Sequence, residues 1–155
     1  FVFAGGEAKQ IEHLRSLAAN LDIAEACVFA GKRPMKEMPA FMTLADGLVS
    51  PRTKGANTAL KLYTYMQSGK PIVATRLPTH TQVLDDTCAV LVQPEVDPLA
   101  EGLLRVLHEP LLVNELGREA QQRVARRYSL ASFKHRVRQA YESLGAAGGS
   151  GKDDG

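Results

Sequence analysis

Short apolar runs alternate with amphipathic segments along most of the chain, and this alternation constrains the fold more than any other feature of the sequence. The apolar runs are FVFAG, ACVFAG, GLVSP, PIVAT and CAVLVQP. Each has the length of one buried strand, and the segments between them carry apolar residues at helical spacing. This order is typical of βαβ units, in which helices cover both faces of a parallel sheet. We therefore predict an α/β fold with a Rossmann-like, doubly wound parallel sheet.

The segments between the strands predict amphipathic helices. The first has an apolar face made of Ile11, Leu14, Leu17, Ala18 and Leu21. The second starts at Pro34, a residue favoured at the first helical position, and its apolar stripe comprises Met35, Met38, Phe41, Met42 and Ala45. The third lies between GLVSP and PIVAT, with Asn57 or Thr58 as its N-cap.

After Pro94 the pattern becomes purely helical, and we expect helices over 98–107, 111–127 and 130–144. The final GAAGGSGKDDG is polar and rich in glycine, which predicts a flexible tail over residues 145–155. A chain of 155 residues with 45% hydrophobic content is long enough for one core and short for two. We therefore predict one domain over residues 1–144.

Composition argues against several classes of protein. The 19 basic and 17 acidic residues leave a net charge of +2, too balanced to indicate a nucleic-acid or membrane partner by itself. No apolar run approaches the roughly 18 residues of a membrane span, and the pattern of a signal peptide is missing, so we expect a soluble, cytoplasmic protein. His13, His108 and His135 lack metal-ligand spacing, while Cys27 and Cys88 sit in apolar runs and are expected to be buried, reduced thiols. We therefore expect no metal.

The loops that follow the strands are the first place to look for a ligand site, because ligands of open α/β sheets bind beyond the carboxyl ends of the strands. Gly5 and Gly6 would let the backbone turn tightly and approach a ligand. Several cations in these loops would form one rim that suits an anion. They are Lys32, Arg33, Arg52, Lys54 and Arg76.

The stretch GANTALKLYTYMQSGKPIVAT, residues 55–75, combines a loop, a helix and a buried strand. Gly55 removes the side chain where the backbone would pass close to a ligand. The amides of Thr58, Ala59 and Leu60 would point out of the helix N-terminus, where the helix dipole favours phosphate or sugar hydroxyls. An ordinary capped helix explains the same residues equally well, and both interpretations stay open at this point.

The order of these pieces resembles the carboxyl-terminal domain of the retaining GT-B glycosyltransferases of the family 4 type, also termed glycosyl transferases group 1. The resemblance is carried by FVFAGG, then VFAG, a helix ending in AD, a strand ending in Ser-Pro, a glycine-containing loop, a helix, and GKPIVA, and it covers residues 1 to about 144. No single piece is specific, but their order and spacing are.

The resemblance implies a site for a nucleotide diphosphate sugar. Gly5 and Gly6 would border the donor cleft, Lys32 and Arg33 would lie near the base, and the Gly55 to Leu60 backbone would hold the phosphates and the sugar. Members of the family usually carry a glutamate before the loop glycine and another in the helix, where this chain has Lys54 and Thr64. A lysine cannot accept hydrogen bonds from sugar hydroxyls, and a threonine reaches the ribose with only one short hydroxyl.

We therefore expect the donor-binding half of a hexosyltransferase-type enzyme, in which Arg52, Lys54 and the helix amides stabilise the departing diphosphate without a metal or other cofactor. The chain begins at FVFAGG, so the resemblance implies a fragment that lacks a first strand and helix and an N-terminal acceptor domain. We expect such a fragment not to transfer sugar alone. The alternatives are a nucleotide-sugar-binding module without turnover and a purely structural α/β domain.

Two further expectations concern the acceptor side. His80 follows the PIVAT strand, so it would lie in the cleft and touch donor or acceptor, or else it is a plain turn residue. The basic helices within residues 117–141 contain interspersed glutamates and apolar faces, so we interpret their charge as a solvated face and expect no nucleic-acid partner. If the acceptor is lipid-linked, these helices would also associate with anionic membrane lipid.

Overall fold

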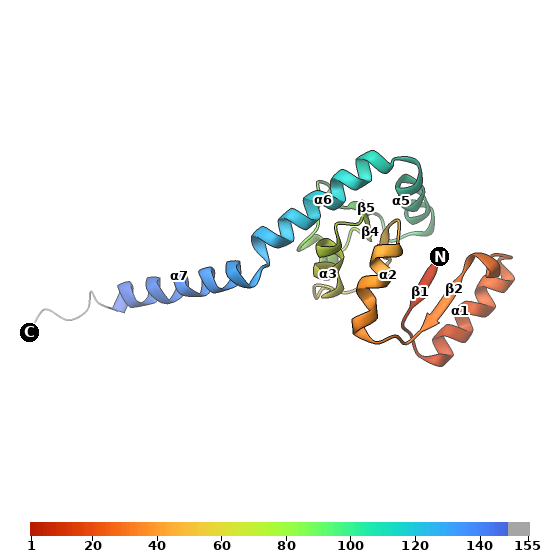
Figure 1. Cartoon of the computed structure of the whole chain (residues 1–155), viewed down its shortest axis with the longest axis horizontal. Helices are drawn as coiled ribbons and strands as arrows, with labels where there is room; N and C mark the ends of the chain where they lie inside the picture. The colour runs from red at the N-terminus through yellow and green to blue at the C-terminus, as the bar shows by residue number, and fades with distance from the viewer. Residues whose placement is uncertain (149–155) are drawn as a thin grey trace, which may run out of the picture. The chain divides into compact units, whose positions relative to one another are not determined.

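The chain folds into two compact units, Phe1–Phe41 and Met42–Gly155, in a computed structural model that describes residues 1–148 (Figure 1). Each unit is an α/β structure with parallel strands, as predicted from the alternation of strands and helices. The prediction of one domain over residues 1–144 stays a prediction.

The first unit is a two-stranded parallel sheet with one long helix. Its elements are β1 (Val2–Ala4), α1 (Ala8–Asn20), the 3-10 turn η1 (Ala24–Ala26), β2 (Val28–Gly31) and the 3-10 turn η2 (Met35–Glu37). Phe3 lies opposite Phe29 in the register, and the two rings stack with centroids 5.0 Å apart. Arg15 of α1 covers the Phe29 ring at 5.6 Å. Ala18 is the one buried residue of this unit, because a single helix covers only part of so small a sheet.

The second unit contains a three-stranded parallel sheet in the order β3-β4-β5. Its strands are β3 (Leu48–Ser50), β4 (Ile72–Thr75) and β5 (Val90–Val92). Its helices are α3 (Lys61–Ser68), α4 (Pro78–Thr81), α5 (Val96–His108), α6 (Pro110–Arg127) and α7 (Leu130–Gly148), while α2 (Met38–Leu44) spans the boundary between the units. The predicted helical pattern after Pro94 is confirmed.

The central strand β4 is buried on both faces, as a doubly wound sheet requires. Ile72 and Ala74 pack into one cluster with α3 and α6, while Val73 belongs to a second cluster with β5 and α5. This follows from the strand's period of two, which sends alternate side chains to opposite faces. All four residues of β4 are less than 3% exposed.

Two glycines bring α3 and α6 together. Gly69 has φ +70°, a left-handed conformation that ends α3. Gly117 of α6 packs directly on that turn, where an added Cβ would lie 2.3 Å from the Gly69 carbonyl oxygen. The second glycine therefore permits a helix contact that no other residue allows without a shift of the backbone.

Several predicted boundaries were wrong. The α3 helix begins at Lys61 instead of Asn57 or Thr58, Pro34 precedes a 3-10 turn instead of opening α2, and α4 was not predicted. The tail expected from residue 145 falls mainly outside the described residues, since α7 continues to Gly148 and the structure describes nothing beyond it. Cys88 is buried and Cys27 is half-buried, and both are free. None of the described helices is both long and apolar enough to cross a bilayer.

Candidate functional site

The loops of the first unit are built from glycine backbone. Gly5 and Gly6 follow β1 with φ values of +107° and +91°, so both adopt conformations that other residues rarely take. The Gly5 amide donates a 2.7 Å hydrogen bond to the Gly31 carbonyl, which joins the ends of β1 and β2. An added Cβ at Gly5 would meet no atom within 4 Å, so the space beside this backbone is open.

The two cations after β2 differ in their surroundings. Lys32 is exposed. Arg33 donates to Glu37 at 2.8 Å and 2.9 Å, in an i,i+4 ion pair on the surface. The charge of Arg33 is therefore partly balanced by its own neighbour, which weakens its candidacy for an anion.

In the second unit, the loop from Pro51 to Leu60 follows β3 and leads into α3. Gly55 lies in the middle of this loop with φ +126°, and the Arg52 guanidinium approaches its Cβ position to 3.6 Å. Arg52 and Lys54 are exposed, and so is Thr64 on α3. Arg52 and Lys54 therefore lie on one loop, and Thr64 lies on the helix that follows it.

The expected helix cap was wrong, for a reason visible in the loop's own hydrogen bonds. The Thr58 hydroxyl donates to Gln82 instead of capping α3, and the Asn57 carbonyl accepts a 2.5 Å bond from the Thr79 hydroxyl. The Ala59 amide, expected to be free for a ligand, donates to the Thr79 carbonyl at 3.2 Å. The loop is held by the α4 turn, and α3 begins only after it.

A network of buried polar side chains lies under this loop. Ser50, Thr75, Thr79 and His80 are the buried polar residues of the described chain, each at most 2% exposed. The His80 ring contacts Ser50 Oγ through Nε2 at 2.9 Å and the Thr75 carbonyl through Nδ1 at 2.7 Å. Arg52 Nη1 donates to Thr79 Oγ1 at 2.9 Å. We refer to Ser50, Thr75, Thr79 and His80 as the buried polar network, to which the exposed Arg52 of the loop is bonded.

The structure corrects the expectation that His80 faces the cleft. Its side chain is 0% exposed, and both ring nitrogens have protein partners. Burial lowers the pKa of His80, and the nearby Arg52 and Lys61 charges act in the same direction, against the hydrogen bond to Thr75 that raises it. His80 therefore does not touch a ligand directly in this arrangement.

Polar residues at the ends of two neighbouring strands are the sequence signal for this network. Thr75 ends a buried strand, and Thr79 and His80 follow within one turn, so hydroxyls and an imidazole cluster at the carboxyl edge of the sheet. Ser50 ends the neighbouring strand β3 in the same way. Polar residues that terminate adjacent buried strands therefore indicate a candidate site, as cations in the loops do.

The charge around the loop is one-sided. No Asp or Glu occurs between Asp46 and Asp85, and within residues 1–148 neither Arg52, Lys54 nor Lys61 forms an ion pair. Burial lowers the pKa of Lys61, with a further contribution from Arg52. The cations of the loop are therefore not paired with a carboxylate within residues 1–148, which favours an anion.

Arg76, also expected on the cationic rim, is different. It forms a bidentate pair with Asp86, whose oxygens lie 2.5 Å and 3.1 Å from the guanidinium nitrogens. That pairing raises the pKa of Arg76. We therefore exclude Arg76 from the candidate site, which in this unit consists of the cationic loop 51–60 and the buried polar network beneath it.

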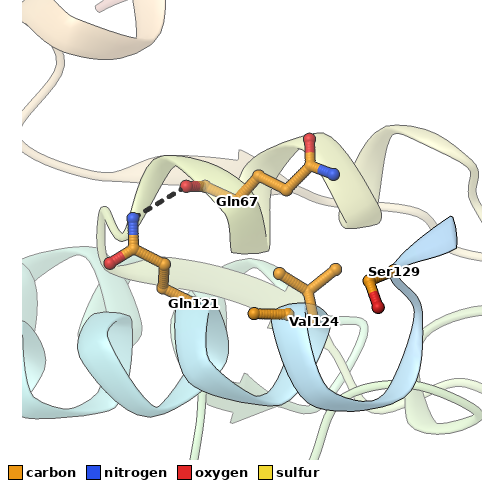
Figure 2. A pocket seen from close by; sticks show the side chains of 5 residues that line it. Gln67, Gln121, Val124 and Ser129 are labelled. Carbon is orange, nitrogen blue, oxygen red and sulfur yellow. Dashed lines mark hydrogen bonds between the residues drawn. The ribbon is translucent and has the colours of Figure 1, made fainter. Parts of the chain in front are cut away.

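A small hollow lies at the other end of α3. Figure 2 shows its wall, where the Gln121 side chain donates to the Gln67 carbonyl at 3.0 Å beside Val124. Its lining residues are Gln67, Gln121, Val124, Ala125 and Ser129, none of which is ionisable. The hollow therefore offers no charged group. Within residues 1–148, no three His, Cys, Asp or Glu side chains are grouped to hold a metal ion.

Comparison with known proteins gives the family context of this site. The sequence model described as Glycosyl transferases group 1 matches residues 1–123. No curated protein sequence matches the chain. The fold resembles Anabaena HepE, solved in complex with UDP, with a TM-score of 0.82 and 18% identity over 92% of this chain and 40% of that one. HepE has also been solved with UDP-glucose.

Two further structures have the same fold. Sucrose-phosphate synthase from Thermosynechococcus elongatus has a TM-score of 0.78 and 19% identity over 94% of this chain and 38% of that one. The C-terminal domain of LpcC, a glycosyl transferase group 1 family protein from Francisella tularensis, has a TM-score of 0.68 and 18% identity over 79% of this chain and 64% of that one. The chain thus spans about 38–40% of the length of HepE and the synthase.

Proposed function

This chain belongs to the glycosyl transferases group 1 family, and we propose that it is the donor-binding half of a retaining enzyme of the family 4 type. The proposed reaction moves a hexosyl group from a nucleotide diphosphate sugar to an acceptor held by another part of the protein. In the second unit the proposed site is the cationic loop 51–60, and a donor-binding role for the loops after β1 and β2 of the first unit is proposed separately.

The unbalanced positive charge of the loop 51–60 is the observation that carries this proposal. A nucleotide diphosphate sugar is an anion, and Arg52 and Lys54 are exposed cations on a loop without a carboxylate. A guanidinium donates in a planar fork that suits phosphate oxygens. Because Arg52 is already tied to Thr79, its orientation would cost little entropy on binding.

The related structures support the choice of ligand class. HepE binds UDP and UDP-glucose, and the LpcC structure is a C-terminal domain of a protein of the same family. By analogy we propose that the backbone at Gly5 and Gly6 borders the donor, with Lys32 and Arg33 toward the base and Thr64 toward the ribose. HepE and LpcC are both longer than the region that they share with this chain. We propose that the acceptor site lies outside that shared region.

The residues of the loop suggest how they would assist the transfer. When the bond between the sugar's anomeric carbon and the diphosphate oxygen breaks, negative charge develops on the leaving group. Arg52 and Lys54 would stabilise that charge, and Gly55 would let the loop backbone approach the phosphates. We propose no metal or cofactor, because these cations would supply the positive charge that the leaving group needs.

A second candidate function is nucleotide-sugar binding without turnover. Lys54 and the exposed Thr64 stand where the family usually has glutamates, and no acidic residue elsewhere between Asp46 and Asp85 replaces them. Without those carboxylates, the contacts to the sugar and ribose hydroxyls must be made differently. The two candidates agree on binding and differ only on whether the complete protein consumes the donor.

Calorimetric titration of the chain with UDP, UDP-glucose, GDP and GDP-mannose tests the proposal. We expect at least one of these to bind, and Arg52→Ala to weaken that binding about 10- to 100-fold, since a charge-assisted contact contributes about 1.5–3 kcal/mol. Arg118→Ala, an exposed position on α6, is the matched control and should leave the affinity unchanged.

Gly55→Val is a second test of the loop conformation, because a β-branched residue is strained at the φ of +126° that Gly55 adopts. Binding of none of the four ligands, or equal binding by Arg52→Ala and the native chain, would refute the proposed site. Consumption of the bound donor by the complete protein supports transfer, and binding without consumption supports the second candidate.

A further inference from the structure

The hydrogen bonds of His80 indicate which ring nitrogen carries the proton in the neutral imidazole. The Thr75 carbonyl oxygen can only accept, so Nδ1, which lies 2.7 Å away, must carry a proton. Nε2 is then free to accept from the Ser50 hydroxyl at 2.9 Å. This pattern satisfies a neutral imidazole completely, and no buried side-chain nitrogen or oxygen of the described residues lacks a partner.

One arm of the buried polar network runs from His80 to the start of the cationic loop. Nδ1 of His80 donates to the Thr75 carbonyl, and the Thr75 hydroxyl lies 3.2 Å from the same nitrogen. The same hydroxyl donates to the Arg52 carbonyl at 2.6 Å. The imidazole therefore sets the position of the threonine that fixes the backbone of Arg52.

A second arm reaches the same loop from the residue next to His80. Thr79 accepts from the Arg52 guanidinium at 2.9 Å and donates to the Asn57 carbonyl at 2.5 Å. Its own carbonyl accepts from the Ala59 amide at 3.2 Å. Arg52, Asn57 and Ala59 are thus anchored on both sides of Gly55, and all these anchors are attached to the turn that His80 holds against β3 and β4.

We propose that His80 is a positioning residue: its neutral imidazole locks Thr75 and Thr79 so that the loop 52–59 and the Arg52 guanidinium are set for an anionic ligand before the ligand arrives. This inference rests on the proposed function for the identity of the ligand, but the anchoring itself does not. A loop ordered in advance loses less conformational entropy on binding, so the lock increases affinity without touching the ligand.

Burial, together with the nearby positive charges, favours the neutral imidazole. The cations that act on the ring are Arg52 on the loop after β3 and Lys61 on α3, while β3 and β4 present only the uncharged Ser50 and Thr75. A proton on Nε2 would add a third positive charge and would deprive the Ser50 hydroxyl of its acceptor. The pKa of His80 lies below its ordinary value of 6.5, mainly because of burial, so the lock is present at neutral pH.

Three variants test the lock. His80→Leu removes both hydrogen bonds, His80→Asn keeps a donor near the position of Nδ1, and Val113→Ala is a control that weakens the core on the other face of the sheet. UDP binding is measured by calorimetry, and amide hydrogen exchange is measured at Ala59, whose amide bonds to the Thr79 carbonyl. Both are measured under conditions where circular dichroism shows each variant to be folded.

We expect His80→Leu to weaken UDP binding at least 10-fold and to accelerate exchange at Ala59 at least 10-fold. His80→Asn should restore both to within about 3-fold of the native chain, and Val113→Ala should change neither. If His80→Leu does not fold, the same comparison is made between Ser50→Ala, which removes the Nε2 partner, and Val113→Ala.

Unchanged exchange at Ala59 in His80→Leu, or in Ser50→Ala where that variant replaces it, overturns the lock whatever the ligand. Equal effects of His80→Leu and Val113→Ala also overturn it, because they indicate a general loss of stability. If the native chain binds no UDP while His80→Leu still accelerates exchange, the anchoring stands and the ligand assigned under the proposed function is wrong.

Discussion

The two units of this chain present their candidate loops by different physical means. In the first, Gly5 and Gly6 shape the loop through their positive φ values and one backbone hydrogen bond from Gly5 to Gly31, and only Ala18 is buried in that unit. In the second, hydrogen bonds from buried side chains hold the loop 51–60, and the sheet beneath it is covered on both faces. The conformation of the second loop therefore depends on side chains that are distant in the sequence, whereas that of the first depends on the glycine pair.

This difference explains which site features can be inferred from sequence. A glycine pair after a strand directly indicates a tight turn, and both glycines do have positive φ values. A loop held by distant hydroxyls carries no such local mark, because Arg52 and Thr79 are 27 residues apart. The contrast also predicts where substitutions change the free energy of unfolding most.

The largest expected difference is between two leucine-to-alanine changes. Leu62 of α3 is 0% exposed within the core of the second unit, whereas Leu17 of α1 is 45% exposed. We expect Leu62→Ala to lower the free energy of unfolding by about 2–5 kcal/mol through lost burial and a cavity. Leu17→Ala should lower it by less than about 1 kcal/mol, since little area is removed from water.

Urea unfolding of the whole chain, followed by circular dichroism, measures both changes. Equal losses for the two variants would show that Leu17 is buried in the folded protein to the same extent as Leu62, and the contrast between the units would then be wrong. Separate unfolding transitions for the two units would sharpen the contrast, because each loss could be assigned to one of them.

Much of the fold could be predicted because it depends on local periodicity. The five strands lie within the five apolar runs, and the helices after Pro94 lie within a residue or two of their predicted positions, apart from the longer C-terminal end of α7. The start of α3 could not be predicted, because a favourable cap residue at Asn57 or Thr58 competes with bonds to Thr79 and Gln82 that come from another loop. Tertiary hydrogen bonds decided that boundary, and a single sequence window does not contain them.

The candidate site shows the same division. The cations Arg52 and Lys54 were identified from their loop, yet the reason for Arg52's fixed orientation lies in Thr75 and Thr79. Arg76 was assigned to the same rim because the sequence does not reveal its pairing with Asp86, ten residues away. His80 was recognised as unusual, but the sequence could not distinguish a residue that touches a ligand from one buried beneath the loop.

A smaller effect is expected at Gly102 of α5 and Gly117 of α6, two glycines that pack closely against neighbouring elements. A Cβ at Gly117 would lie 2.3 Å from the Gly69 carbonyl oxygen, whereas at Gly102 it would meet the Val92 side chain at 2.8 Å. We expect Gly117→Ala to cost about 1–3 kcal/mol because backbone must move. Gly102→Ala should cost less, since a side chain moves more easily than a backbone turn.

Denaturant midpoints of the two alanine variants measure this pair. In an unconstrained helix the change from glycine to alanine would be stabilising by about 1 kcal/mol, so even a neutral result indicates a packing cost. A gain in stability for Gly117→Ala would contradict the close contact between α6 and the end of α3. Gly117 would then have open space beside it, as Gly5 has.

The smallest expected difference concerns two surface carboxylates. Asp85 accepts from Arg123 at 2.7 Å across 38 residues, whereas Glu37 pairs with Arg33 within one helical turn. The hydrogen bond from Arg123 is the main reason why the pKa of Asp85 falls from 3.8 to about 2, with Thr87 contributing. Because the folded-state pKa is lowered, this stabilisation is present above about pH 4 and is lost as the pH falls through 2.

Asp85→Asn and Glu37→Gln, compared by urea unfolding between pH 2 and pH 7, test this tertiary ion pair. Asp85 is a partly exposed group, so we expect Asp85→Asn to cost no more than about 1 kcal/mol at pH 7, and Glu37→Gln about 0.3–0.5 kcal/mol. The cost of Asp85→Asn should shrink as the pH approaches 2, where the native carboxyl is also becoming neutral. A cost that stays constant over this range would mean that Arg123 holds Asp85 by geometry rather than charge, since asparagine keeps an acceptor oxygen but not the negative charge.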